Sequence, residues 1–282
     1  MLRGRLRALT GLLPALLLAL STSASGKEGA AKARAKPART AKVGKLKAQP
    51  KRTNARKPSR QKTSRLLEVL PGGQLARTPA YRYANMTNDE AYAELARRSI
   101  RFRRADPPPE GVRAPIRLLG PLHGVHIHSA LPAPDRAKSH YEVLDARLAL
   151  ALDDFCALLE LEEIVELVHF TMYRPGASPP ADSDALPTRH PGGLAIDVGA
   201  LRKRDGTWLD VGLHWQADIG KRTCGPGAKS HSAEPAKALA SLVCEAAAKH
   251  LFTYMLTPHY DRAHHDHLHL EIKPGVKWFL VQ

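Results

Sequence analysis

The chain has 282 residues, with 43 Lys or Arg against 27 Asp or Glu and a formal net charge of +16. The charge is unevenly distributed: residues 1–26 carry a net +3 and residues 27–65 a net +14, which leaves about −1 for residues 66–282. This distribution excludes a strongly basic folded domain. The 217 residues from 66 to 282 suffice for one substantial domain, with residues 66–135 as a possible N-terminal lobe.

Residues 1–26 have the features of a secretory signal peptide: a basic start, an apolar run from Ala8 to Leu20 and a small-residue end. The apolar run is shorter than the roughly 20 residues that a membrane-crossing helix needs. We therefore expect a periplasmic or secreted protein without a membrane span in its mature form.

Residues 27–65 contain 15 Lys or Arg and a single acidic residue, Glu28. A segment of this composition cannot bury a hydrophobic core, so the sequence predicts a disordered polybasic linker. Such a linker could bind anionic polymers of the cell envelope through salt-sensitive contacts. A solvated spacer without a partner is the alternative, and nucleic acid is not expected as the partner of an exported chain.

The first predicted helix runs from Asn88 to Arg98, because Thr87 and Glu90 form a capping-box pair. Hydrophobic periodicity then predicts strands over 116–119 and 125–128, a helix over 144–160 and a strand over 164–172. On this helix, four apolar residues share one face: Leu148, Leu152, Phe155 and Leu159.

The second half of the chain begins with a predicted hairpin, strands 194–201 and 207–211 around Asp205-Gly206. A helix over 235–249 follows, with Ser232 as its expected cap. Four of its residues should point inward: Leu239, Leu242, Val243 and Ala246. With a last strand over 264–272, these elements predict an α+β domain with a mostly antiparallel sheet and flanking helices.

Three cysteines follow the predicted signal peptide, an odd number in a chain expected outside the cytoplasm. We expect Cys224 to pair with Cys244, joining the loop after the hairpin to the last helix. Cys156 is then expected to be a buried free thiol.

Two histidine-containing stretches stand out. In the first, His190 and Asp197 lie seven positions apart with glycines between them, which allows a bent loop and a following strand to aim both side chains at one point. In the second, alternation along the strand 264–272 places four polar side chains on one face: His265, His267, His269 and Glu271.

Catalytic zinc takes three protein ligands and leaves a further position to water. His190, Asp197 and one histidine of the His267-Leu268-His269 sequence would complete such a set, and the spacing allows either histidine as the third ligand. The similar sequence His126-Ile127-His128 has no second ligand cluster near it and is interpreted as an ordinary half-exposed strand.

The pattern Thr188-x-His190-x-x-Gly193-x-Ala195-x-Asp197, followed by His267-x-His269, resembles the zinc-site pattern of the LAS metallopeptidases. This group includes lysostaphin, D-alanyl-D-alanine peptidases and hedgehog-type domains. Over residues 66–282 the chain resembles the bacterial extensin-like C-terminal domain family, itself similar to the penicillin-insensitive murein endopeptidases.

The resemblance implies a LAS- or hedgehog-type domain in which His190, Asp197 and His269 hold zinc and His267 is the base for a metal-activated water. It further implies that His264 is an active-site histidine. Arg174 matches an arginine that contacts a substrate carboxylate in related peptidases, and a surface arginine at a strand end is the alternative.

The function expected from this resemblance is hydrolysis of peptide bonds in bacterial peptidoglycan by an exported zinc metallopeptidase, either an endopeptidase or a carboxypeptidase. One alternative is a non-catalytic cell-wall-binding module braced by zinc. Another is an adhesin whose residues 27–65 do the binding. The presence of His267 favours the enzyme.

Overall fold

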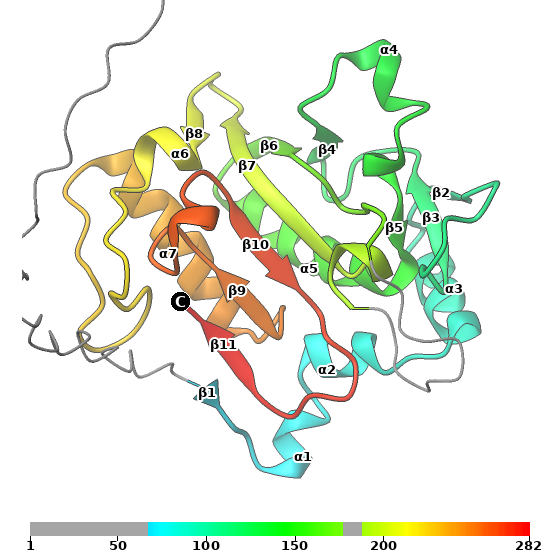
Figure 1. The fold of residues 1–282 in the computed structure, drawn as a ribbon, viewed down its shortest axis with the longest axis horizontal. Helices are drawn as coiled ribbons and strands as arrows, with labels where there is room; N and C mark the ends of the chain where they lie inside the picture. The colour runs from blue at the N-terminus through cyan, green and yellow to red at the C-terminus, as the bar shows by residue number, and fades with distance from the viewer. Residues whose placement is uncertain (1–66, 177–187) are drawn as a thin grey trace, which may run out of the picture. The chain divides into compact units, whose positions relative to one another are not determined.

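A sheet of eight strands forms the centre of this protein in the computed structural model, which describes residues 67–176 and 188–282 (Figure 1). The strand order is β1-β11-β9-β10-β7-β6-β4, with β8 paired to β7. Most neighbours are antiparallel, while β4–β6 and β9–β11 are parallel. The strands are β1 (Leu67–Glu68), β4 (His126–Ser129), β6 (Ile164–His169), β7 (Ala195–Lys203), β8 (Trp208–Asp210), β9 (Tyr254–Leu256), β10 (Leu268–Glu271) and β11 (Phe279–Val281).

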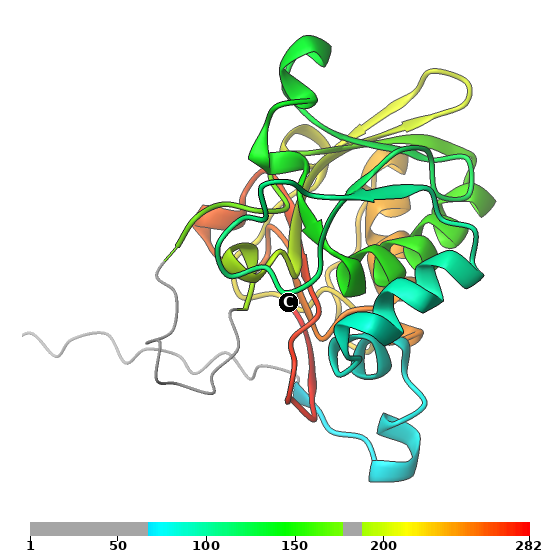
Figure 2. The same cartoon turned by 90° about the vertical axis from the view of Figure 1, so that its right-hand side faces the viewer.

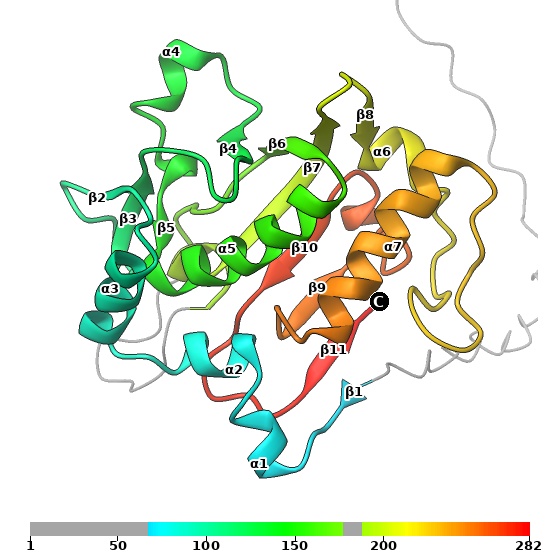
Figure 3. The same cartoon turned by 180° about the vertical axis from the view of Figure 1, so that it is seen from behind.

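Two long helices, α5 (Ala146–Leu161) and α7 (Glu234–Ala248), cover one face of this sheet, as Figure 3 shows from behind. The predicted inward residues of α5 are each at most 1% exposed, and those of α7 at most 3%. They pack with apolar residues of β7 and β10 in one core. The predicted α+β class and the inward faces of both helices are therefore confirmed.

The N-terminal helices α1 (Gly72–Leu75), α2 (Pro79–Ala84) and α3 (Asn88–Arg97) precede a second sheet. The predicted capping box starts α3: the Thr87 side chain accepts from the Glu90 backbone N–H, and the Glu90 carboxylate accepts from the Thr87 N–H. The second sheet has the order β2-β3-β5 and lies beside α3, on the side that Figure 2 turns toward the reader. Its strands are β2 (Phe102–Arg104), β3 (Pro115–Leu118) and β5 (Leu144–Asp145).

Short helices connect the strands: α4 (Ala133–Arg136), α6 (Val211–His214), and the 3₁₀ turns η1 (His140–Glu142), η2 (His190–Gly192) and η3 (Arg262–His264). The hairpin of β7 and β8 is confirmed, but β8 ends at Asp210 because the Asp210 side chain accepts from the Leu213 N–H and caps α6. The cap of α7 differs too. Its N-cap residue is Ala233, without a side-chain hydrogen bond, so Ser232 is not the cap.

The last predicted strand is shorter than expected. The residues from 262 to 264 form η3 instead, because the Asp261 carboxylate accepts from the N–H groups of Ala263 and His264. His265 is consequently exposed, with its Nδ1 3.0 Å from the Arg262 carbonyl oxygen, and it does not share a strand face with His269. The strand expected over 164–172 ends at His169.

The predicted disulfide joins Cys224 to Cys244, and Cys156 is a buried free cysteine. Burial raises the pKa of the Cys156 thiol well above its ordinary value, which keeps it protonated and unreactive. Within the described ranges, no helix combines the length and the apolar character needed to cross a membrane. The signal peptide and the polybasic linker predicted over residues 1–65 lie outside the described residues.

Candidate metal centre

Two neighbouring strands bring the two predicted clusters together. Asp197 lies on β7 and His269 on β10, directly opposite each other in the antiparallel register of these strands. Residues paired in this way carry their side chains on the same face. The alternate residues Ile196, Leu268 and Leu270 point into the core, each at most 2% exposed. The register therefore holds the carboxylate and the imidazole in contact.

The loop before β7 adds His190 from η2. It bends sharply: Arg189 has φ 57° and ψ −144°, and Gly193 has φ 63°. A Cβ atom at Gly193 would lie 2.9 Å from the backbone nitrogen of Asp145, so this position requires glycine both for its backbone angle and for its space. The loop closes with a hydrogen bond from the Leu194 N–H to the Arg189 carbonyl.

The three side chains form one compact group. Ligand atoms of His190, Asp197 and His269 all lie within 4.8 Å of one another, and the side chains are 3%, 8% and 5% exposed. Nε2 of His190 is 3.1 Å from Oδ2 of Asp197, and Nδ1 of His269 is 2.9 Å from Oδ1 of Asp197. The structure thus brings together all three residues that were predicted as ligands.

The donor atoms suit a metal ion. Nδ1 of His190 lies 3.3 Å from the Met172 carbonyl and donates to it in the tautomer that leaves Nε2 with a lone pair. This Nε2 is buried and has no hydrogen-bond partner among the described residues. Two imidazole nitrogens and a carboxylate oxygen are a set that divalent zinc accepts. The group could hold a metal ion.

The charge on Asp197 is stabilised in place. Burial opposes its ionisation, but the close contacts with the His190 and His269 imidazoles outweigh burial and lower the pKa of the Asp197 carboxyl well below its usual range. Burial likewise lowers the pKa of His269, and the Asp197 and Glu271 carboxylates reverse this, so the net shift is upward. Asp197 is therefore an anion at neutral pH, as a metal ligand must be.

His267 and His264 lie beside this group. Nε2 of His267 is 3.6 Å from Oδ1 of Asp197, and its Nδ1 is 2.9 Å from the carboxylate of Asp266. The His264 ring centroid is 5.1 Å from that of His267 and 5.9 Å from that of His269. A regular strand would have sent His264 to the opposite face, whereas η3 returns it to the face of the metal group.

Glu271 is a functional candidate that the sequence reasoning assigned no role. Its side chain is fully buried, with Oε2 3.4 Å from Nε2 of His269 and 3.6 Å from Nε of Arg189. When the Glu271 carboxylate accepts a hydrogen bond from Nε2–H of His269, the lone pair of the ring lies on Nδ1, the atom that faces Asp197. Outer carboxylates orient metal-binding histidines in this way. The signal was present in the alternation of His269 and Glu271 along one strand.

Arg174 is not brought into this group: its side chain is exposed at the end of the described segment 67–176, and the described residues show no contact between it and the metal group. Its substrate-binding role stays a prediction. The earlier pair His126 and His128 lies on β4, where Nε2 of His128 is 2.7 Å from the Glu166 carboxylate, in an ordinary strand as expected.

The comparison with curated proteins gave no match, and neither did the comparison with solved structures. The model of one protein family, described as extensin-like protein C-terminus, matches residues 156–279. This region contains His190, Asp197 and His269 together with both cysteines of the disulfide. The match supports assignment of this part of the chain to the extensin-like C-terminal family.

Proposed function

We propose that this protein is an exported zinc-dependent peptidase that hydrolyses peptide bonds of bacterial peptidoglycan. The observation that carries the proposal is the buried group of His190, Asp197 and His269, with two further histidines against it. The similarity of this ligand pattern to the LAS metallopeptidases supplies the substrate class. A zinc ion in this group would polarise the scissile carbonyl and lower the pKa of a water to about 7.

His267 is the base in this proposal. Its Nδ1–H donates to Asp266, which leaves the lone pair on Nε2, the nitrogen that faces Asp197 and the metal group. An imidazole with its basic nitrogen fixed in this direction takes a proton from water and returns it to the leaving amine. His267 is also placed to donate to an oxyanion after it has been protonated.

His264 extends this arrangement. Its Nδ1 lies 2.7 Å from the Asp261 carboxylate and donates to it, so Nε2 is the acceptor atom. Burial lowers the pKa of His264 more strongly than Asp261 raises it, which keeps the ring neutral at pH 7. In our proposal it orients substrate or water next to His267.

The competing proposal is a wall-binding module in which the metal only braces the fold. The deep burial of the three ligand side chains is consistent with it, but structural zinc sites usually have four protein ligands, and this group supplies three. In both proposals the basic segment 27–65 binds anionic envelope polymers and holds the protein at the cell wall.

The test is to incubate the purified protein, loaded with one equivalent of zinc, with peptidoglycan sacculi and to search for new peptide termini by mass spectrometry. His267→Ala should abolish cleavage while zinc stays bound. His265→Ala is the matched control, because His265 is two positions away and 69% exposed. Intact sacculi with a stoichiometrically loaded protein would refute the peptidase and leave the binding module.

A further inference from the structure

A groove of about 310 Å³ lies between the two sheets, bordered by β3, β4 and α4, which Figure 1 labels. Three arginines line it, namely Arg103 on β2, Arg117 on β3 and Arg136 on α4. The groove reaches Met172, whose carbonyl oxygen lies 3.3 Å from Nδ1 of His190. The basic groove and the metal centre therefore share a wall.

Two of these arginines oppose each other across the strand pair. Arg103 and Arg117 are direct partners in the antiparallel register of β2 and β3. Like charges in this position destabilise a sheet. Neither guanidinium has a hydrogen bond or an ion pair with any of the described residues. Burial, and next the charge of Arg103, lower the pKa of Arg117, and the charge of Glu142 offsets this only in part.

The one carboxylate in the groove is already engaged. Glu142 accepts the Ser129 N–H at 2.8 Å and lies 3.6 Å from Nε2 of His169. Burial raises the pKa of Glu142, but the nearby His169 ring and the hydrogen bond from the Ser129 N–H outweigh it and lower the pKa to about 2. The third arginine, Arg136, is held in place by donation from its Nε to the Leu131 carbonyl at 2.7 Å.

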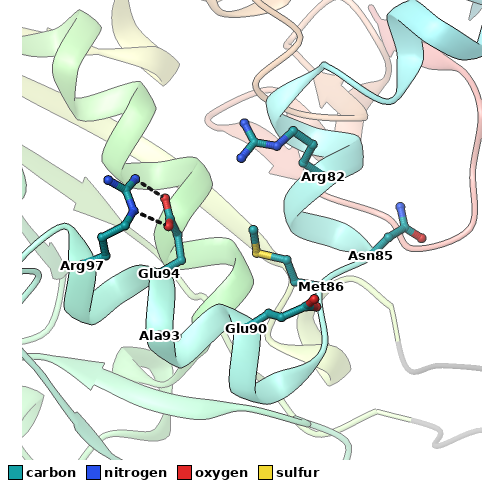
Figure 4. Close-up of a pocket in the computed structure, with 7 residues that line it drawn as sticks. All are labelled: Arg82, Asn85, Met86, Glu90, Ala93, Glu94 and Arg97. Atoms are coloured by element: carbon teal, nitrogen blue, oxygen red, sulfur yellow. Dashed lines mark hydrogen bonds and ion pairs between the residues drawn. The ribbon is translucent and has the colours of Figure 1, made fainter.

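A second pocket contains an arginine that is paired with a carboxylate. The pocket between α2 and α3, drawn in Figure 4, also contains arginines, but there Arg97 makes two hydrogen bonds to Glu94 at 2.6 and 2.7 Å. The charge of Arg97 is therefore neutralised within the pocket. Among the described residues, Arg103 and Arg117 have no such direct ion pair, and the charge of Glu142 acts on Arg117 only through space.

We propose that this groove is a binding site for the carboxylate group of an acidic peptide. Two guanidinium groups side by side match a planar carboxylate, since each donates parallel hydrogen bonds to its oxygens. The repulsion between Arg103 and Arg117 is relieved when the anion lies between them. The identification of this peptide as the substrate of the metal centre rests on the proposed function, whereas the binding itself does not.

The test measures binding to the full chain without metal, so that cleavage plays no part. The probes are acetyl-Ala-Glu-Ala-amide and its neutral counterpart acetyl-Ala-Gln-Ala-amide, titrated at about 150 mM salt by calorimetry. Arg103→Gln and Arg117→Gln should each weaken binding of the Glu peptide about tenfold or more, because a charge-assisted contact is lost. The affinity of the Gln peptide should be the same for the wild type and for both variants.

Arg104→Gln is the matched control. Arg104 follows Arg103 on β2, but its guanidinium lies over the Tyr92 ring at 4.4 Å, outside the groove. The substitution Arg104→Gln therefore removes the same charge without removing a contact in the groove. If Arg104→Gln weakened binding of the Glu peptide equally, the effect would be a general attraction between the positive protein surface and the peptide. That result would overturn the proposed site. Stronger competition by inorganic phosphate than by acetate would overturn the carboxylate assignment.

A thermal readout separates a binding role from a structural one. Arg103→Gln should raise the midpoint of thermal unfolding while it weakens binding, because it removes a like-charge pair. Arg104→Gln should lower that midpoint, because it removes a cation–π contact. A lower midpoint for Arg103→Gln would contradict the proposal. Peptide binding without any cleavage of sacculi would leave this site standing and refute only the peptidase.

Discussion

Two histidine clusters in this protein differ in whether a carboxylate is in direct contact with the imidazoles. In the metal centre, Asp197 lies 2.9 Å from His269 and 3.1 Å from His190. In the second cluster, which we call the Trp215 cluster, His231 and His259 stack with ring centroids 5.7 Å apart, and the Trp215 ring packs edge-on against both. Its contacts come from aromatic rings.

The difference appears in the chemistry of the imidazoles. Burial, and next the charge of His231, lower the pKa of His259 to about 4, whereas carboxylates raise the pKa of His269 despite its burial. In the Trp215 cluster the backbone N–H of Asp218 donates to Nδ1 of His259, which puts its proton on Nε2. Among the described residues, the group of histidines that could hold a metal ion is thus the one in which a strand partner supplies an anion.

The largest effect should come from the removal of that anion. Asp197→Asn removes the one anionic side chain among the three candidate ligands, and the neutral amide is a much weaker donor to a divalent cation. We expect zinc affinity to fall roughly a thousandfold, measured by competition with a chromogenic chelator. His231→Asn, in the Trp215 cluster, should leave the affinity unchanged. A similar loss in both variants would contradict the distinction between the clusters.

The disulfide should matter for the fold and not for the metal. Cys224 and Cys244 close a loop over a sequence separation of 20 that also carries His231. The double replacement by serine should lower the free energy of unfolding by about 3 kcal/mol in the chain-entropy estimate. Urea unfolding of the metal-free protein measures this, and zinc affinity should stay within about twofold. Loss of zinc binding in the folded variant would show that the two regions are coupled.

Sequence patterns predicted the parts of the site that depend on local rules. Thr87 and Glu90 form a helix cap whose hydrogen bonds lie within four residues of the chain. His190 and Asp197 are close in sequence, so one bend followed by a strand is enough to bring them together. The pairing of β7 with β10 is a long-range contact, and here the prediction depended on the resemblance of the whole pattern.

Other features depend on interactions without a periodic signal. The start of β10 shifted because one side chain, Asp261, holds a 3₁₀ turn that neither strand nor helix periodicity reveals. The burial of Glu271 is set by β7 and β9 on either side of β10. The opposition of Arg103 and Arg117 exists only in the register of β2 and β3. Tertiary pairing decides the last two features, and the Asp261 turn is a local cap without a periodic signal, so hydrophobic periodicity could not predict any of the three.

Glu271→Gln tests how far the carboxylate effect extends beyond the ligands. The amide still fills the buried position but loses the charge that lies 3.4 Å from Nε2 of His269. Loss of such an outer partner costs about 10- to 100-fold in metal affinity. Nuclear magnetic resonance of the His269 ring in the metal-free protein should show a change in tautomer populations. Glu142→Gln, outside the metal group, is the control; an unchanged tautomer in Glu271→Gln would remove Glu271 from this role.

The last prediction concerns the Trp215 cluster and pH. The pKa of His259 is about 4 when folded and about 6.5 when unfolded, so the unfolded chain takes up the proton first as the pH falls. Its contribution to stability is complete above about pH 6.5 and is lost between there and about pH 4, with a slope of up to about 1.4 kcal/mol per pH unit. His259→Gln should flatten the pH dependence of the metal-free protein in urea unfolding across this window, while the exposed control His265→Gln should follow the wild type. If the pH dependence of unfolding in His259→Gln kept the slope of the wild type, another group would set the acid sensitivity of the fold. The comparison between the two clusters would then not rest on the titration of His259.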